Sequence, residues 1–285
     1  MCMISRIIVM AVGLVNLVGC GKTPTSQLTE QFPVIRSGPY NMEFGFIPKG
    51  LFLAGDDEPN TRRWVRLSKD YWVQTKEVTR GQWHAVMGTY PDQDVLGLAY
   101  GVGKCADRDK VIARDDHPVV CVTWLRVQEY IERLNGQFEG GGYEYRLPTD
   151  AEWEYAAKSH SVKSLLIDSS VNLFAWHRDN SGDQTHRGGE LKANFFGLYD
   201  IYGNVHEWVL DDGLVAYEKA DDPLHPVVDP LMTKARPDNK LLRGGGFNTS
   251  PSILKASYRA ICVNNHPIRS VGFRMIRVET ETSNR

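Results

Sequence analysis

The longest hydrophobic stretch of the chain lies near its beginning. Ile7–Gly19 is apolar except for Asn16, and Arg6 stands directly before it. This stretch is shorter than the ~20 apolar residues that a membrane-spanning helix needs. A short apolar core behind a positive charge is typical of a secretory signal peptide. The hydrophobic pattern therefore predicts an exported protein.

The hydrophobic stretch ends at a cysteine. The tetrapeptide LVGC, which ends at Cys20, resembles the lipobox of bacterial lipoproteins. The resemblance implies a signal peptide over residues 1–19 and attachment of lipid to the Cys20 thiol. Because Gly21 and not Asp follows, we expect sorting to the outer membrane of a Gram-negative bacterium, and the small polar residues after it predict a tether over 20–41. The alternative is a plain secretory signal in which Cys20 stands by chance.

Alternating and aromatic segments predict short strands. The segment 43–54 mixes aromatic and aliphatic residues around a Pro-Lys-Gly turn, which predicts a hairpin. The segment 64–75 partly alternates and predicts another strand, and shorter strand-like pieces occur at 205–210, 240–243 and 271–278. The rest of the second half shows little periodicity, so we expect a loop-rich domain.

Helical periodicity follows three threonines, which are Thr79, Thr123 and Thr149. Gln82 and Glu152 stand three residues after the first and third of them, which is the spacing of a capping box. Apolar residues at helical spacing follow each threonine. We therefore predict three helices, the first ending at Gly88 and the second at Asn135-Gly136. With the strands, they indicate one α+β domain.

Composition narrows the classes of function. Lys+Arg 33 against Asp+Glu 35 gives a net charge of −2, and 42% of the residues are hydrophobic. This balance lacks the basic surface typical of nucleic-acid-binding proteins, so we expect no nucleic-acid partner. The hydrophobic fraction is that of an ordinary globular domain.

The five cysteines gain meaning from the predicted export. Cys2 would leave with the signal peptide and Cys20 would carry lipid. Cys105 and Cys121 bracket a polar loop, and an oxidising compartment favours a disulfide between them. The alternative is two buried thiols. Cys262 lies in an apolar segment and is expected to be a buried core thiol, with a reactive thiol as the alternative.

Several long motifs point to a family. They are, in chain order, Tyr145–Ala157 (YRLPTDAEWEYAA), Gly197–Asp200 (GLYD), Gly203–Trp208 (GNVHEW), Arg243–Gly245 (RGG) and Gly272–Arg274 (GFR). Together they resemble the formylglycine-generating enzyme (sulfatase-modifying factor) domain family over residues 42–279, which leaves a tail over 280–285. The resemblance implies a C-type-lectin-like α+β fold with few regular elements. In this fold we expect the helix after Thr149 to be scaffold.

The resemblance also implies a structural calcium ion. The positions that match the calcium-binding segment of the family are Asp200, Gly203, Val205 and Glu207. Carboxylate and carbonyl oxygens suit this hard cation. The alternative is a turn in which the two carboxylates accept backbone N–H groups. An upstream calcium site would use Asn172, Leu173 and Asn180, although their spacing departs from the family.

The copper positions of the family differ in this chain. The family oxidises a protein cysteine with copper(I) held by two cysteines after an Arg-Gly-Gly motif, behind a serine. A gapless alignment places Gly246 at the serine and Thr249 and Leu254 at the cysteines. Copper(I) requires soft thiolate ligands, which these residues lack. We therefore expect no copper at these positions and assign no catalytic residue.

Iron is a second metal used by relatives of this family. Those proteins take histidine ligands from a helical domain that this sequence lacks. His177 and Asp179 form an H-x-D pair such as non-haem iron sites use, but the sequence places no second histidine beside them. We expect no iron site and interpret both as loop residues.

Three hypotheses for function follow. The first is a non-catalytic envelope module that binds a protein, glycan or peptidoglycan partner and is held to the membrane by lipid. The second is a divergent oxidoreductase resembling the pyoverdine-maturation protein of the same family. The third is a formylglycine-generating oxidase with unusual ligands. The replaced cysteines favour the first.

Overall fold

The computed structural model describes most of the chain beyond residue 33. The described residues are 34–37, 40–56, 62–91, 105, 114–159, 170–213, 222–233 and 237–280. The predicted signal peptide, Cys20 and residues 281–285 of the predicted tail lie outside them. Within the described ranges, no helix combines the length and hydrophobicity that a membrane crossing requires.

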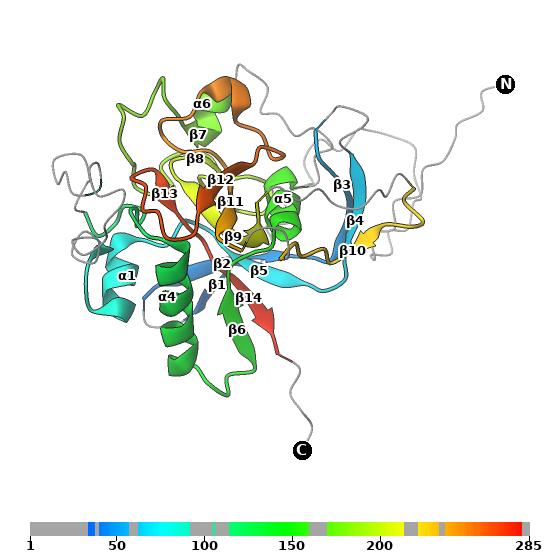
Figure 1. The fold of residues 1–285 in the computed structure, drawn as a ribbon, viewed down its shortest axis with the longest axis horizontal. Helices are drawn as coiled ribbons and strands as arrows, with labels where there is room; N and C mark the ends of the chain where they lie inside the picture. Colours follow the sequence, from blue (N-terminus) through cyan, green and yellow to red (C-terminus); the bar gives the residue numbers. More distant parts are fainter. Residues whose placement is uncertain are drawn as a thin grey trace, which may run out of the picture. The chain divides into compact units, whose positions relative to one another are not determined.

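The first sheet joins the two ends of the described chain (Figure 1). Its strands are, in spatial order, β1 (Val34–Ser37), β2 (Met42–Ile47), β5 (Tyr71–Gln74), β14 (Ile276–Glu279) and β6 (Tyr143–Arg146). All neighbours are antiparallel. β1 lies within the predicted tether 20–41 and pairs with β2, so regular structure begins before residue 42.

The predicted hairpin over 43–54 is wrong in its pairing. Both strands form, as β2 and β3 (Gly50–Ala54), but they belong to different sheets. Since β1 and β5 occupy both edges of β2, β3 pairs with β4 (Arg63–Leu67) instead. The prediction of one strand over 64–75 is also wrong, because the segment divides into β4 and β5 in separate sheets.

Two further sheets and a short strand pair complete the domain. β3 and β4 form a sheet with β10 (Val227–Val228), which runs parallel to β4. The third sheet contains, in spatial order, β12 (Ala260–Val263), β11 (Asn239–Arg243), β9 (His206–Asp212) and β13 (Val271–Gly272). β7 (Ala175–Trp176) pairs with β8 (Tyr202–Gly203). The strand-like pieces predicted at 205–210, 240–243 and 271–278 are confirmed as β9, β11, β13 and β14.

Three helices begin where the capping threonines predict them. They are α1 (Arg80–Met87), α4 (Trp124–Gln137) and α5 (Asp150–Lys158), and each threonine hydroxyl accepts the N–H three residues on. Both predicted capping boxes form. Gly88 ends α1 in the left-handed conformation, which glycine adopts without steric cost.

The second helix continues past its predicted end. The Asn135 side chain does not cap α4; its amide pairs with both backbone groups of Tyr145 on β6, at 2.8 Å each. The helix therefore reaches Gln137. Two short helical turns, α6 (Val171–Phe174) and a 3₁₀ turn at Pro251–Ile253, lie in the loop-rich second half.

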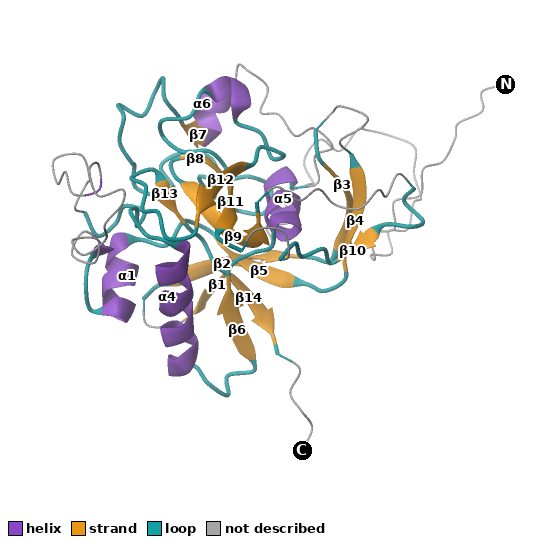
Figure 2. Cartoon of the chain, viewed as in Figure 1, coloured by secondary structure: helices purple, strands orange, loops and turns teal. Residues whose placement is uncertain are grey.

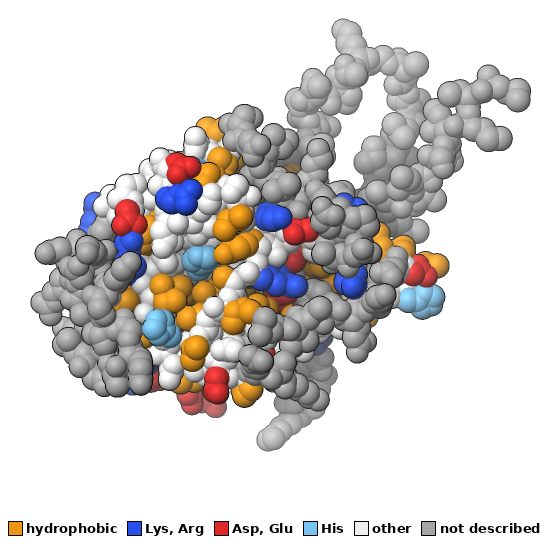
Figure 3. All heavy atoms as spheres, turned by 45° about the horizontal axis from the view of Figure 1, so that its top comes forward, with side chains coloured by type: hydrophobic (Ala, Val, Ile, Leu, Met, Phe, Trp, Pro, Cys, Tyr) orange, Lys and Arg blue, Asp and Glu red, His pale blue; other side chains and the backbone are white. Residues whose placement is uncertain are grey.

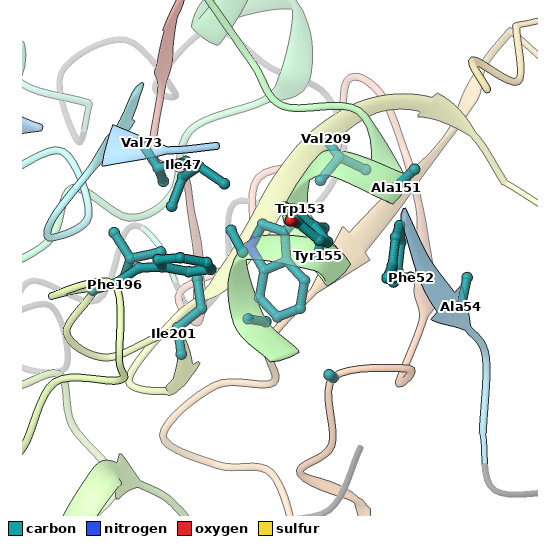
Figure 4. Packing of buried hydrophobic residues seen from close by; sticks show 14 of the residues in the cluster. Ile47, Phe52, Ala54, Val73, Ala151, Trp153, Tyr155, Phe196, Ile201 and Val209 are labelled. Atoms are coloured by element: carbon teal, nitrogen blue, oxygen red, sulfur yellow. The ribbon is translucent and has the colours of Figure 1, made fainter. Parts of the chain in front are cut away.

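Two large hydrophobic clusters form most of the core of the described residues, and a small third one, the disulfide cluster, contains Cys105, Val120, Cys121 and Val205. Alternate side chains of the first sheet enter different clusters, such as Phe44 and Ile47 of β2. In one cluster, Trp153 and Tyr155 of α5 lie between Phe196 and Phe52 (Figure 4). In the other, Trp83 of α1 stacks on Tyr130 of α4, with ring centroids 5.3 Å apart. Figure 2 shows these two helices side by side.

The cysteine predictions are confirmed where the structure describes them. Cys105 and Cys121 form a disulfide, and both are buried. Cys262 is a free, buried thiol on β12. Trp153 and Trp208 are almost fully buried, and Trp124 is half-buried. Arg146 pairs with Glu152 at 2.7 Å.

Candidate functional site

The loop after β11 carries the positions that correspond to the copper ligands of the family. Gly245 has a left-handed backbone, and a Cβ atom there would lie 2.3 Å from a methyl carbon of Leu254. A Cβ atom on Gly246 would lie 3.1 Å from the carbonyl oxygen of Ser270. The buried Leu254 side chain therefore fills the second cysteine position, and the serine position has little room for a side chain.

Thr249, at the first cysteine position, is held by two hydrogen bonds. Its hydroxyl accepts from the Gly246 N–H at 2.9 Å and lies 3.2 Å from His206 Nε2. Burial lowers the pKa of His206 to about 4, so the ring is neutral near pH 7. A neutral Nε2 that accepts from the hydroxyl leaves the proton on Nδ1, which has no partner in the described part of the chain. Thr249 is thus a packed, hydrogen-bonded residue of the loop.

The free thiol does not restore a copper site. Cys262 pairs in register with Lys240 across β12 and β11, and its Sγ lies 3.5 Å from the Val263 carbonyl oxygen. Burial raises the pKa of Cys262 to about 11, so it remains a thiol at neutral pH. Copper(I) would find a hydroxyl and an isobutyl group at the two family positions, and the donor set does not fit this ion.

Glu207, which follows His206 on β9, lies in a different environment from the loop that holds Thr249. Glu207 is fully buried, and its oxygens accept from Arg274 Nε at 2.8 Å and from Trp153 Nε1 at 2.7 Å. Arg274 Nη2 also lies 2.7 Å from the carboxylate. This two-pronged ion pair occupies most of the acceptor positions of Glu207. In this structure the Glu207 carboxylate is thus engaged mainly by Arg274 and Trp153.

Asp200 is the residue of the predicted calcium segment that fits a cation best. Its Oδ2 accepts the Gly189 N–H at 2.7 Å, while its Oδ1 is buried without a partner in the described residues. Asp200 has a left-handed backbone (φ 53°), which a non-glycine residue rarely adopts. Gly203 is needed sterically, since a Cβ there would lie 2.2 Å from the Trp176 carbonyl oxygen. Val205 is fully buried against the disulfide cluster.

One buried carboxylate near Asp200 was not among the predicted site residues. Glu77, between β5 and α1, is 2% exposed, and its Oε1 has no partner among the described residues. Asn204 Nδ2 lies 3.4 Å from its other oxygen. Burial and the nearby Asp200 carboxylate raise the pKa of Glu77 well above its usual value. In the sequence, Glu77 stands before the apolar Val78 and the helix-capping Thr79. No motif in the sequence linked it to Asp200.

The proposed upstream calcium residues hold a histidine instead. Asn172 Oδ1 contacts His177 Nε2 at 2.7 Å, and Asn180 Oδ1 accepts the His177 N–H at 2.7 Å. The Leu173 carbonyl oxygen accepts the Lys192 N–H. These oxygens are therefore engaged in holding the loop after β7.

No histidine joins the H-x-D pair in the part of the chain that can be described. Asp179 of that pair is 58% exposed and lies 3.5 Å from Arg178 Nε. Throughout the described stretches, no group of three or more His, Cys, Asp or Glu side chains is arranged to hold a metal. Any cation site here would therefore need carbonyl or water oxygens besides its carboxylates.

A small cavity lies beside the loop after β11. It has a volume of about 240 Å³ and is lined by Cys105, Asn248 and residues 266–270. The Arg269 guanidinium at this cavity packs over the Phe247 ring and pairs with Asp183 at 2.5 Å. Figure 3, which turns the top of the molecule forward, shows histidine side chains among hydrophobic ones on the face that it views. The lining combines the apolar residues Pro267 and Ile268 with the polar residues Asn248, His266, Arg269 and Ser270.

Known proteins with similar sequences include both enzymes and a chaperone. Chaperone protein LppX of Paenibacillus barcinonensis is 25% identical over 260 residues, covering 73% of this chain and 80% of that protein. The formylglycine-generating enzyme of Mycobacterium tuberculosis is 32% identical over 162 residues, covering 50% of this chain and 51% of the enzyme. The chain thus spans about half the length of that enzyme.

Solved structures share the fold at lower identity. PvdO from Pseudomonas aeruginosa has a TM-score of 0.67 and 21% identity, covering 88% of this chain and all of that one. Treponema denticola variable protein 1 also has a TM-score of 0.67, with 22% identity, and covers 86% of this chain. A model of the sulfatase-modifying factor enzyme 1-like domain matches residues 25–279. The chain therefore belongs to the sulfatase-modifying factor (formylglycine-generating enzyme-like) domain family, and its loop-rich α+β structure has the fold of that family.

Proposed function

We propose that this chain is a lipid-anchored protein of the bacterial cell envelope whose domain binds a partner without oxidising it. One observation carries this proposal. Thr249 and Leu254 fill the two positions at which the family holds copper(I), and the loop packs tightly around both. A fold that keeps its loops but lacks the thiolate pair retains a binding surface and lacks the metal site.

The partner that best suits this surface is another protein. One relative, covered over 80% of its own length, is named a chaperone, which supports a role in binding or assembling proteins. The cavity of about 240 Å³ beside the loop is too small for a long glycan, and its lining mixes apolar residues such as Ile268 with polar ones such as Asn248. A glycan or peptidoglycan ligand is the alternative that the binding experiment must separate.

Copper binding tests the non-catalytic part of the proposal. The full-length protein in detergent is titrated anaerobically with copper(I), and oxygen uptake is then followed with a cysteine-containing peptide. We expect no stoichiometric copper and no uptake. The double variant Thr249→Cys/Leu254→Cys, which restores the family pair, serves as the control and should gain copper(I). Stoichiometric copper with oxygen uptake by the unaltered protein would contradict the proposal.

Partner contact is tested by site-specific cross-linking in intact cells. A photo-reactive residue at the exposed Asn248 beside the cavity should give discrete protein adducts. The same residue at Glu132, which is exposed on α4, is the matched control and should give none of these adducts. Adducts that disappear with glycosidase or lysozyme instead of protease would indicate the glycan or peptidoglycan alternative.

The anchor has a separate test. Cys20→Ser should move the protein from the membrane fraction to the soluble fraction, because the acylated thiol is the proposed point of attachment. Cys262→Ser changes a buried cysteine of the domain and should leave the protein in the membrane fraction. Equal membrane retention of both variants would contradict the proposed lipid anchor.

A further inference from the structure

We propose that the opening between β5 and β14 binds an extended segment of a partner protein and takes a lysine or arginine side chain of that segment against Trp72. The inference rests on the proposed function, because it requires that the partner is a protein. It places a second contact surface away from the loop after β11, since no residue lines both cavities.

The first sheet opens where β5 and β14 part. The register between these strands ends at Trp72 and Arg277. Beyond Arg277, β14 continues beside β6 through Glu279. Figure 1 shows β14 and β6 turning away from β2 and β5. A cavity of about 890 Å³ is lined by β2 and β5 on one side and by β14 and β6 on the other.

The backbone of β14 is open toward this cavity. Antiparallel strands exchange hydrogen bonds at every second pair of residues. The Gln74 N–H donates to the Met275 carbonyl oxygen at 2.9 Å, so the bonding positions of β14 toward β5 recur at Arg277 and at Glu279. The ladder has already ended at Glu279. Its N–H and carbonyl groups can therefore pair with a strand that enters the opening.

Two aromatic side chains form one wall of the opening. Phe46 and Trp72 pair in register on β2 and β5, and their ring centroids lie 5.0 Å apart in an edge contact. Both are half-buried and line the cavity. Arg277, which faces Trp72 in the ladder, packs its guanidinium over the Tyr143 ring instead, at 3.9 Å. Tryptophan is the side chain whose ring attracts a cation most strongly, and Trp72 is placed to receive one from a partner.

The charges around the cavity favour a cationic ligand. Five carboxylates and three basic side chains line it, which leaves a formal charge of −2. Arg146 and Glu152 bind each other through two hydrogen bonds of 2.7 Å and so neutralise one another. Glu144 and Glu279 are exposed, and within the described stretches neither side chain has a hydrogen bond or an ion pair. These two carboxylates border the opening from β6 and β14 and can bind an ammonium or guanidinium group.

An extended chain suits this opening better than a compact small molecule. The Glu279 backbone supplies the hydrogen bonds of a strand edge, and the side chains of an added strand point alternately to two sides. One side would carry the basic group toward Trp72. Apolar contacts come from the half-buried Leu210 and Val278 and from Leu231, which is 50% exposed.

Fluorescence anisotropy on the full-length protein in neutral detergent tests the inference with three labelled peptides. Each has seven residues that alternate threonine with lysine, glutamine or glutamate. The lysine peptide should bind at least about tenfold more tightly than the other two. The double variant Glu144→Lys/Glu279→Lys should lose this preference. Glu132→Lys adds the same charge on α4, outside the cavity, and should keep it.

Two results would overturn the inference: equal affinity for the three peptides, or a lysine preference that survives the double charge reversal. Both reversed side chains are exposed, so the variant should fold. Cross-linking in intact cells separates this surface from the proposed function. A photo-reactive residue at Leu231 should give protein adducts that the double variant loses. Protein adducts from Asn248 alone would keep the proposed function and reject this opening, and none from either position would reject both.

Discussion

The two faces of β9 differ in the charge of the side chains that are buried against them. His206 points toward the loop after β11, where Thr249 accepts the Gly246 N–H and contacts the ring, and Leu254 fills the remaining space. Glu207, the next residue, points toward Arg274 and Asp200. There, two buried carboxylate oxygens have no partner among the described residues.

This difference separates the copper position of the family, which carries no thiolate here, from a buried group of carboxylates whose oxygens would suit a hard cation. The copper position of the family is occupied by protein atoms and has no soft ligand. The carboxylate face carries an excess of negative charge that a hard cation would balance. Adjacent residues on one strand thus have different surroundings: one face closes the family's copper position, and the other buries several carboxylates.

The largest expected effect concerns the ion pair on the carboxylate face. Glu207→Gln leaves Arg274 buried without its anion, which should lower the free energy of unfolding by about 3–5 kcal/mol. Because Glu207 acts through Arg274, the loss should be equal in calcium and in EGTA. Denaturant unfolding in both buffers checks this. A loss seen only in calcium would make Glu207 a calcium ligand instead of the partner of Arg274.

The next effect is that of the calcium ion predicted at the carboxylate face. At a calcium concentration about 100 times the dissociation constant, binding to the folded state should add about 2.7 kcal/mol to stability. EGTA should remove this stabilisation from the unaltered protein and should leave the stability of the Glu77→Gln variant unchanged. Thermal unfolding with and without chelator measures both. An unaltered protein whose midpoint ignores EGTA would contradict a calcium site on this face.

A smaller effect is expected on the opposite face. Thr249→Val keeps the shape of the side chain but leaves the buried Gly246 N–H without its acceptor. Stability should fall by about 2 kcal/mol. The calcium affinity should not change, because the two faces are separate. A calorimetric titration of this variant that showed weaker calcium binding would show instead that the two faces are coupled.

The smallest effect concerns the reactivity of the free thiol. Burial raises the pKa of Cys262 to about 11, so the thiolate fraction is very small at neutral pH. Below this pKa, the fraction rises about tenfold for each unit by which the pH is increased. Alkylation of the folded protein by iodoacetamide should therefore be slow at pH 8 and rise steadily with pH. Mass spectrometry after timed alkylation measures the rate. Rapid alkylation at pH 7 would indicate an activated thiol and reopen a redox role.

Local features of the fold could be predicted from sequence, and long-range pairings could not. The capping boxes at Thr79 and Thr149 depend on residues three positions apart, so the helices began where predicted. The hairpin over 43–54 failed because β1 and β5 already occupy both edges of β2. Local sequence signals do not predict such pairings. They also do not predict that β5 pairs with β14, which lies some two hundred residues further along the chain.

The candidate site follows the same division. The segment from Asp200 to Glu207 was recognisable because its residues lie within one motif. Glu77 and Arg274 belong to the site through backbone contacts between separate elements, which no motif records. Alignment alone predicted that Thr249 and Leu254 replace the copper cysteines. The packing that closes this position could be seen only in the structure.

The metal content of the full-length protein, purified from bacterial envelopes without chelator, tests the central claim most directly. Elemental analysis should find about one calcium per chain and neither copper nor iron above trace level. The Glu77→Gln variant purified in parallel should have lost the calcium. Stoichiometric copper or iron in the unaltered protein, or calcium retained in full by Glu77→Gln, would contradict the account.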